Sequence, residues 1–249
     1  MTPTLKTTAM MAAMLLATAM PALAQDGVAN AQANIDAYSG IPDFVAPGEP
    51  FDAKTCMAGQ SILTIPASSA IPFIKTIADQ KGKLAETIGF KHEQWENQGN
   101  PTQWIQGMEY AGNNGFGLIS LLAGADPRFF EPQVKAAQGK GLKVVSSHLT
   151  GLELAAPAGV DGNTAIDYKQ AGKLMADWTI AQTGGKVNAL ILVSNEALST
   201  DSLTDGLTEA FAENCPDCKF DIVNVPIVDW ATKIQPTVQG KLQADAGIN

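Results

Sequence analysis

Polar and aromatic side chains follow one short apolar run after another in this sequence, close to where each run ends. They are Ser68, Ser69, Phe73, Trp95, Asn97, Asp126, His148, Asn195, Glu196 and Trp230. An aromatic ring stacks on the apolar face of a small molecule, and hydroxyl, amide, carboxylate and imidazole groups hydrogen-bond to its polar edge. These residue types therefore indicate binding of a small polar molecule.

Each of these residues also has a structural interpretation. Aromatic residues such as Phe73 and Trp230 are often part of a core. Asp126 stands before Pro127 and suits the N-cap of a helix, and His148 suits a hydrogen-bonded loop. The residues alone leave both interpretations open, while a position just after a strand favours contact with a ligand.

Catalytic and metal-binding patterns are weak in this chain. It contains no G-x-G-x-x-G, no Walker loop and no G-x-S-x-G. His92 and His148 are the only histidines, and their spacing does not match a metal site. His148, Glu196 and a serine would make a triad only if the fold brought them together. We therefore predict no enzyme activity, no metal site and no cofactor.

The apolar runs have the length of buried strands, and helical patterns separate them. Residues 62–65 form the first run, Pro66 ends it, and a helix with apolar residues at a 3.6-residue period follows from Pro72. Further strands are expected at residues 90–95, 117–122, 142–147, 187–193 and 220–225. The alternation predicts an α/β fold with parallel sheets, in which the carboxyl ends of the strands meet at one edge. The candidate residues would lie at this edge.

A break in the repeat divides the predicted fold into two lobes. Residues 149–163 show no clear periodicity and are typical of a crossover, after which Asn163 or Thr164 would cap a long helix. The last helix is expected to begin near Pro236, because proline is unfavourable inside a helix. The predicted parts are a signal peptide at residues 1–24, an extended leader at 25–58, an N-terminal lobe at 59–160 and a partial second lobe at 161–249.

The first 24 residues have the pattern of a cleavable signal peptide. Lys6 precedes an apolar stretch, and Ala22-Leu23-Ala24 precedes the expected cleavage site before Gln25. A membrane anchor would need a longer apolar span of roughly 20 residues. We therefore expect an exported protein.

The charge of the chain limits the ligands and partners that suit it. Loss of Lys6 with the signal peptide changes the formal net charge from −9 to −10. Nucleic acids require clusters of Lys and Arg, so no nucleic-acid partner is expected. Arg128 is the only arginine, which disfavours a multiply anionic ligand.

Cys215 and Cys218 form a Cys-Pro-Asp-Cys motif, and Cys56 stands alone. In an exported chain the close pair favours a local disulfide. Metal or redox chemistry remains the alternative, although no second cysteine pair or nearby histidine completes a zinc set. Cys56 is expected to be a free or buried thiol.

From about residue 59 to residue 249 the sequence resembles the periplasmic sugar-binding proteins of ABC transporters with the type I, ribose-binding-like fold. The resemblance is carried by four segments in order. They are Ile65-Pro66-Ala67-Ser68-Ser69 with Pro72-Phe73, Asp161 through Trp178, Thr204-Asp205-Gly206-Leu207, and Val228-Asp229-Trp230. It implies two α/β lobes that close on a sugar, and a chain that stops short of the family's full second lobe.

The resemblance also implies roles for single residues and for partners. Phe73 and Trp230 would stack on the ligand, with Ser69 and Asp229 beside them. The family's acidic-basic pair after the fourth strand falls on Ser147 and His148, and its ligand-binding arginine after the fifth strand falls at about Asp201. Both depart from the family's pattern and argue against ribose or another simple pentose. The implied protein is a periplasmic monomer that delivers a sugar or polyol to an ABC permease. The alternatives are a ligand-binding part of a chemotaxis or two-component sensing system, and a carrier of a non-sugar molecule.

Overall fold

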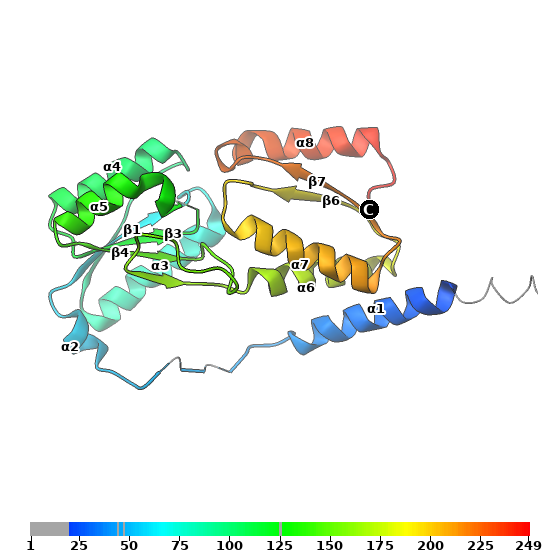
Figure 1. Cartoon of the computed structure of the whole chain (residues 1–249), viewed down its shortest axis with the longest axis horizontal. Helices are drawn as coiled ribbons and strands as arrows, with labels where there is room; N and C mark the ends of the chain where they lie inside the picture. Colours follow the sequence, from blue (N-terminus) through cyan, green and yellow to red (C-terminus); the bar gives the residue numbers. More distant parts are fainter. Residues whose placement is uncertain (1–19, 44, 47, 125) are drawn as a thin grey trace, which may run out of the picture.

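The computed structural model describes residues 20–43, 45–46, 48–124 and 126–249 of the chain. It contains two α/β units, each a parallel sheet with helices against it. The carboxyl ends of the strands in one unit face those of the other (Figure 1). This confirms the predicted α/β class with two lobes.

The first unit is built on a five-stranded parallel sheet of order β2-β1-β3-β4-β5. Its strands are β1 Ser61–Pro66, β2 Lys91–Gln94, β3 Leu118–Leu122, β4 Lys143–Ser147 and β5 Gly162–Thr164. Its helices are α3 Pro72–Ile88, α4 Pro101–Asn113 and α5 Glu131–Gly139, with the short 3-10 helix η1 Pro127–Phe130. The first four strands agree with the strands expected from the sequence, although β2, with the sequence Lys-His-Glu-Gln, is polar.

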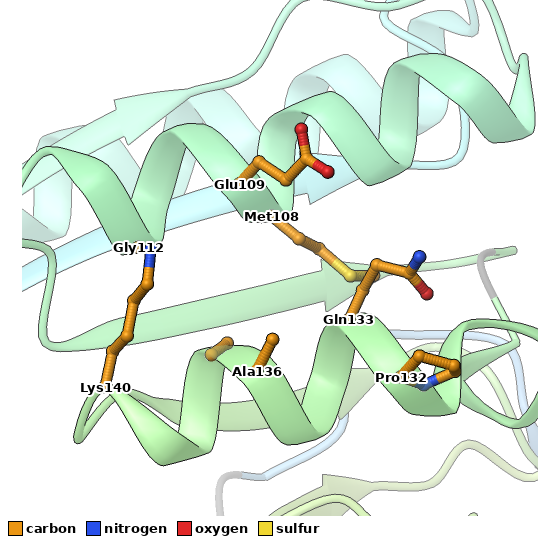
Figure 2. A pocket seen from close by; sticks show the side chains of 8 residues that line it. Met108, Glu109, Gly112, Pro132, Gln133, Ala136 and Lys140 are labelled. Carbon is orange, nitrogen blue, oxygen red and sulfur yellow. The ribbon is translucent and has the colours of Figure 1, made fainter.

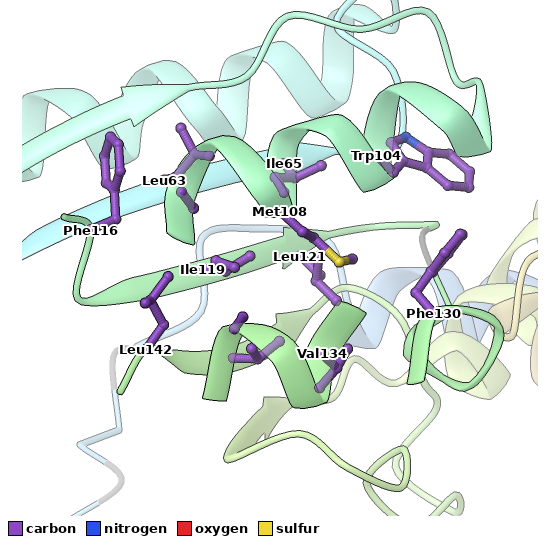
Figure 3. Close-up of a cluster of buried hydrophobic side chains, with 13 residues drawn as sticks. Leu63, Ile65, Trp104, Met108, Phe116, Ile119, Leu121, Phe130, Val134 and Leu142 are labelled. Carbon is purple, nitrogen blue, oxygen red and sulfur yellow. The ribbon is translucent and has the colours of Figure 1, made fainter. Parts of the chain in front are cut away.

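The core of this unit lies between the sheet and helices α4 and α5. Leu63 and Ile119 point from the sheet toward Met108 and Val134 of the two helices (Figure 3). All four side chains are at most 2% exposed. Burial of such side chains holds β1 and β3 in register, which fixes the loops at their carboxyl ends.

The second unit pairs two parallel strands, β6 Asn188–Val193 and β7 Lys219–Asn224. Its helices are α6 Tyr168–Thr183, α7 Ser199–Asn214 and α8 Trp230–Ala244, with the 3-10 helix η2 Ile227–Asp229. Helices α6 and α7 approach so closely that a Cβ on Gly172 or Gly206 would overlap the backbone of the other helix. Only glycine permits this approach.

A long helix precedes both units. Helix α1, Met20–Ala37, packs on α6 and α7 (Figure 1). Ala31 is fully buried there. Asn34 Nδ2 donates to Asp177 Oδ2 over 2.9 Å, and Asn30 Nδ2 donates to Asn214 Oδ1 over 2.6 Å. The segment predicted to be an extended leader, residues 25–58, is thus helical in its first part and again at α2, Ala53–Met57.

The predicted signal peptide, residues 1–24, lies outside the described residues as far as residue 19. Its last five residues belong to the start of α1, and the expected cleavage site before Gln25 falls inside that helix. Residues of α1 that follow this site, among them Asn30, Ala31 and Asn34, contact the second unit.

Three other expectations differ from the structure. Residues 162 and 163, the end of the predicted crossover, belong with Thr164 to β5, which pairs with β4. Helix α6 is capped by Asp167, whose side chain accepts from Gln170 N over 2.9 Å, rather than by Asn163 or Thr164. Helix α8 begins at Trp230 and contains Pro236, because η2 starts the helical turn before the proline is reached.

Candidate ligand-binding cleft

A cavity of about 350 Å³ lies between the carboxyl ends of the two sheets. The first unit contributes Phe73 at the start of α3 and His148 after β4. The second unit contributes Tyr168 at the start of α6 and Trp230 at the start of α8. Residues far apart in the sequence therefore meet at a single hollow, as expected for the strand ends of parallel sheets.

A second cavity, of about 510 Å³, adjoins the first and shares Gly124 and Ile227 with it. Asp126 and Phe129 line it from the first unit, and Glu196 and Val228 from the second. We refer to the two cavities together as the cleft.

A third hollow, of about 180 Å³, lies on the outside of the first unit, between α4 and α5. Figure 2 shows Met108, Glu109 and Lys140 around it. No strand ends there, and one unit forms it alone. It therefore lacks the features that make the cleft a candidate site.

Asn97 holds the loop after β1 in place. Its Nδ2 donates to Pro66 O over 2.9 Å, and its Oδ1 accepts from Gly99 N over 2.8 Å and from Trp104 Nε1 over 3.1 Å. Its backbone N donates to Ser69 Oγ over 3.0 Å. Since Asn97 is only 4% exposed and engages its own loops, it acts as a brace rather than as a free ligand contact.

The other small polar residues of this region are engaged in a similar way. Ser68 Oγ accepts from Ala70 N over 3.2 Å, and Ser69 N donates to Asn97 O over 2.9 Å. Ser147 Oγ lies 3.4 Å from Lys81 Nζ, beneath α3. Burial lowers the pKa of Lys81 to about 8, since the charged amine is poorly solvated there.

Asp126 caps η1 and binds the only arginine. Its Oδ1 accepts from Arg128 N over 2.9 Å, and its Oδ2 lies 2.7 Å from Arg128 Nη2. Asp126 is 2% exposed, so its carboxylate is satisfied within η1. The helix-cap interpretation of Asp126 is confirmed, and the residue lies at the edge of the second cavity.

Two residues at the cleft have strained backbones. Ala123 and His148 have φ angles of 53° and 55°, and they are the only described non-glycine residues in the left-handed region. Each directly follows a strand, and both line the first cavity. Such strain persists where the surrounding structure imposes it, and it is concentrated at functional sites.

The backbone N and O of His148 are hydrogen-bonded, whereas its ring nitrogen Nδ1 has no hydrogen-bond partner. Its N donates to Thr164 O over 3.2 Å, and its O accepts from the Tyr168 hydroxyl over 2.9 Å. The ring lies edge-on to Phe73, with 6.2 Å between centroids. Burial, and then the charge of Lys81, lower the pKa of His148, so the neutral imidazole is favoured.

In the second unit, Trp230 is the best-positioned candidate. Its Nε1 donates to Ser194 Oγ over 2.8 Å and to Val225 O over 3.0 Å, which fixes the ring against the cavity. Glu196 Oε1 accepts from Ile227 N over 2.5 Å and so ties the loops after β6 and β7 together.

The structure thus brings together Phe73, His148 and Trp230 at one cavity and Asp126 and Glu196 at the next. The other candidates lie elsewhere. Trp95 packs on Tyr110, with 5.1 Å between centroids, and its Nε1 donates to Gln103 O. Asn195 is exposed and Asp229 pairs with Lys233 over 2.8 Å. Neither lines either cavity.

Sequence reasoning missed several lining residues. Tyr168 follows β5, a strand with no apolar run to reveal it, and Phe129 belongs to η1 rather than to a regular helix. Ile227 and Val228 follow the predicted strand at residues 220–225 after Pro226 alone. A search for candidates among all residues just after each predicted strand would therefore have included them.

The described residues show no group of three or more His, Cys, Asp or Glu side chains that could hold a metal ion. Among the helices that the structure describes, none is long and apolar enough to cross a membrane. Cys215 and Cys218 form a disulfide at the end of α7, and Cys56 is an exposed free thiol.

A family model for a periplasmic binding protein domain matches residues 62–249. The chain belongs to this family. The match covers both α/β units of the domain and leaves helix α1 outside it. A comparison with curated protein sequences gave no match.

Several solved structures share the fold. The periplasmic binding protein of the arabinose ABC transporter from Shewanella sp. ANA-3, bound to L-arabinofuranose, is 16% identical with a TM-score of 0.62, over 76% of this chain and 61% of that one. An ABC transporter solute-binding protein from Burkholderia graminis, bound to D-arabinose, is 20% identical with a TM-score of 0.63, over 76% and 64%. The Caulobacter myo-inositol binding protein is 15% identical with a TM-score of 0.60, over 75% and 62%.

These likenesses concern the fold, since all three identities are 20% or lower. The chain spans less than two thirds of the length of each of these proteins. The periplasmic binding protein domain described here therefore corresponds to part of each relative.

Proposed function

We propose that this chain is the ligand-binding part of a solute-binding protein that captures a sugar or polyol and delivers it to an ABC permease. The proposal rests on one observation above all, the cleft that residues after β1, β4, β6 and β7 form between two units. Solved proteins of the same fold are described as bound to arabinose and to myo-inositol. The proposal includes no catalysis, because the solved proteins of the same fold are described as binding proteins.

The geometry of the cleft suits capture by closure of two lobes. Phe73 and Phe129 stand on one wall, and Trp230 and Val228 stand on the other. A ligand that touches both walls stabilises the arrangement in which they are close, and hinge closure of this kind is common around small ligands. Rings on opposite walls could then stack on the C–H faces of a sugar.

The proposal includes export to the periplasm as a monomer. It is supported by the apolar stretch before Ala22-Leu23-Ala24 and by the periplasmic family that the chain belongs to. Expression with export followed by N-terminal sequencing tests it. The expected mature chain begins at Gln25, and a chain that keeps Met1 after export contradicts a cleavable signal peptide.

A thermal-shift screen of the chain tests ligand binding. Pentoses, hexoses, myo-inositol, glycerol and the common amino acids are each added at 1 mM, a concentration chosen for this experiment. A ligand with a dissociation constant of about 10 μM would stabilise the folded state by about 2.7 kcal/mol at that concentration. A shift with a sugar or polyol supports the proposal, whereas a shift only with an amino acid, or with no compound, contradicts it.

A further inference from the structure

The walls of the cleft are mostly hydrocarbon. In the first cavity, the side chains with a polar atom are those of His148, Tyr168, Ser199 and Trp230. The remaining lining residues of this cavity are alanine, glycine, isoleucine, leucine and phenylalanine. A fully hydroxylated ring would therefore meet few partners on the walls described here.

Most of the polar atoms at the cleft already have partners within the protein. The Trp230 indole N–H donates to Ser194 Oγ and Val225 O, and the Tyr168 hydroxyl donates to His148 O. In the second cavity, Asp126 is bound to Arg128, and Glu196 Oε1 accepts from Ile227 N. The exposed carboxylate of Glu196 is the one polar group there with an oxygen left to accept from a ligand. A ligand hydroxyl could bond to these groups only by adding to, or replacing, contacts that hold the cleft in shape.

One buried polar atom at the cleft has no partner. Among the described residues, His148 Nδ1 and Thr204 Oγ1 are the buried side-chain atoms without a hydrogen bond. Thr204 lies on α7 and does not line either cavity, whereas His148 lines the first. A buried polar atom without a partner is unfavourable. Because His148 Nδ1 is covered by protein atoms in this arrangement, it offers a position for a hydrogen bond to a ligand only when the loops around it shift on binding.

Large apolar side chains are exposed at the same place. Phe73 is 63% exposed, Phe129 is 74% exposed and Val228, on the opposite wall, is 54% exposed. All three line the cleft. Their apolar surface remains in contact with water unless a ligand covers it, so a ligand with an apolar face gains most from this site.

We propose that the cleft selects a neutral sugar ring that carries an apolar substituent, such as a deoxy or an aryl-substituted sugar, over a fully hydroxylated polyol. This inference rests on the proposed function and specifies the class of its ligand. The apolar substituent covers Phe73 or Phe129, and one polar group of the ring bonds to His148 Nδ1. A hydroxyl placed on the apolar walls would lose its bonds to water without replacement.

Calorimetric titration of the whole chain with matched pairs of sugars tests this inference. L-Rhamnose and L-mannose differ by one hydroxyl, and phenyl and methyl β-D-glucoside differ by the aromatic ring. We expect the more apolar member of at least one pair to bind about tenfold more tightly or better. Equal or tighter binding of the less apolar member in both pairs overturns the inference but leaves the proposed function intact. Absence of binding by every sugar and by myo-inositol overturns the proposed function as well.

Two variants and a matched control connect the preference to the cleft. Phe73→Ala and Phe129→Ala are each expected to reduce the ratio of the dissociation constants of the two pair members at least threefold, a threshold set for this comparison. Phe51→Ala is the control, because Phe51 is also 74% exposed but lies before β1, outside both cavities. Thermal unfolding confirms that each variant folds. An unchanged preference in both cleft variants, or an equal loss in the control, overturns the inference.

Discussion

The two units hold their walls of the cleft in different ways. The first unit has five strands, and its core residues Leu63 and Ile119 are fully buried between sheet and helices. In the described residues, the second unit has two strands, β6 and β7. No side chain of either strand is fully buried. The second unit gains support from α1, whose Ala31 is fully buried against α6 and α7.

The polar contacts differ in the same way. In the first unit, Asn97 joins two loops of the same unit, and its bond to Pro66 O spans 31 residues of sequence. In the second, Asn214 of α7 joins Asp177 of α6 to Asn30 of α1, across 184 residues of sequence. The first wall of the cleft is therefore held by its own unit, and the second depends on a helix outside the matched domain.

The largest effect is expected from the core of the first unit. Ile65→Ala removes a side chain that is 0% exposed, and it should lower the free energy of unfolding by about 2–5 kcal/mol because it leaves a cavity. Urea unfolding measures the change. Ile41→Ala, at a residue 99% exposed, is the control and should change little. A similar loss in both variants would contradict a core at Ile65.

The next effect concerns the buried polar contacts of the second unit. Asn214→Ala removes the 2.6 Å bond from Asn214 Nδ2 to Asp177 Oδ1, at a carboxylate that is 1% exposed. We expect a loss of about 1–3 kcal/mol in the free energy of unfolding. Asn113→Ala, at an exposed residue, should change stability by no more than about 0.5 kcal/mol.

The same substitution in a shortened chain tests whether α1 supports the second unit. In a chain that lacks residues 25–37, Asn30 and Asn34 are gone, so part of the polar cluster is already lost. Asn214→Ala should then cost less than in the full chain, since contacts in one cluster are not additive. Equal costs in the two chains would show that α1 does not support the second unit.

A smaller effect is expected from Lys81 of the first unit. Its pKa is lowered to about 8 in the folded protein from an ordinary value of 10.5. Between these pH values the unfolded chain binds more protons, so the free energy of unfolding should rise with pH, by an amount on the order of 1 kcal/mol. Denaturant unfolding at several pH values measures this rise. Lys81→Met should reduce it, and an identical pH profile in that variant would show that Lys81 is well solvated.

The smallest effect concerns His148. Its pKa is lowered from an ordinary value of 6.5 by burial and by Lys81, so the ring is neutral at pH 7.5. Ligand affinity should therefore fall as the pH is lowered below 6.5, where the ring gains a proton and Nδ1 can no longer accept a hydrogen bond. Calorimetry gives the affinity at each pH. His148→Ala should bind more weakly and lose this pH dependence, and a fall that persists in the variant would exclude His148 as its cause.

Strands β1, β3 and β4 could be predicted because short apolar runs must be buried. Strand β5 could not, since Gly162-Asn163-Thr164 has no apolar pattern and is placed by its pairing with β4. Helix α1 was also missed, because its alanine-, asparagine- and glutamine-rich sequence gains its order from contacts with α6 and α7. Local patterns do not contain such distant contacts.

The candidate site was predicted in part, and for a similar reason. The sequence places Phe73, Asn97 and His148 near strand ends, but it does not show where their side chains point. The structure turns Asn97 inward to brace two loops and leaves Phe73 at the cavity. Polar residues near strand ends can stabilise the loops instead of binding a ligand, and only their hydrogen bonds distinguish the two roles.

The most direct test of the cleft is an NMR titration that follows the four tryptophan indole N–H signals. Trp230 and Trp104 line the two cavities, whereas Trp178 is 57% exposed on α6 and Trp95 packs on Tyr110. On addition of a ligand found by the screen, the signals of Trp230 and Trp104 should shift and that of Trp178 should stay in place. A shift of Trp178 without a shift of Trp230 would contradict binding between the two units.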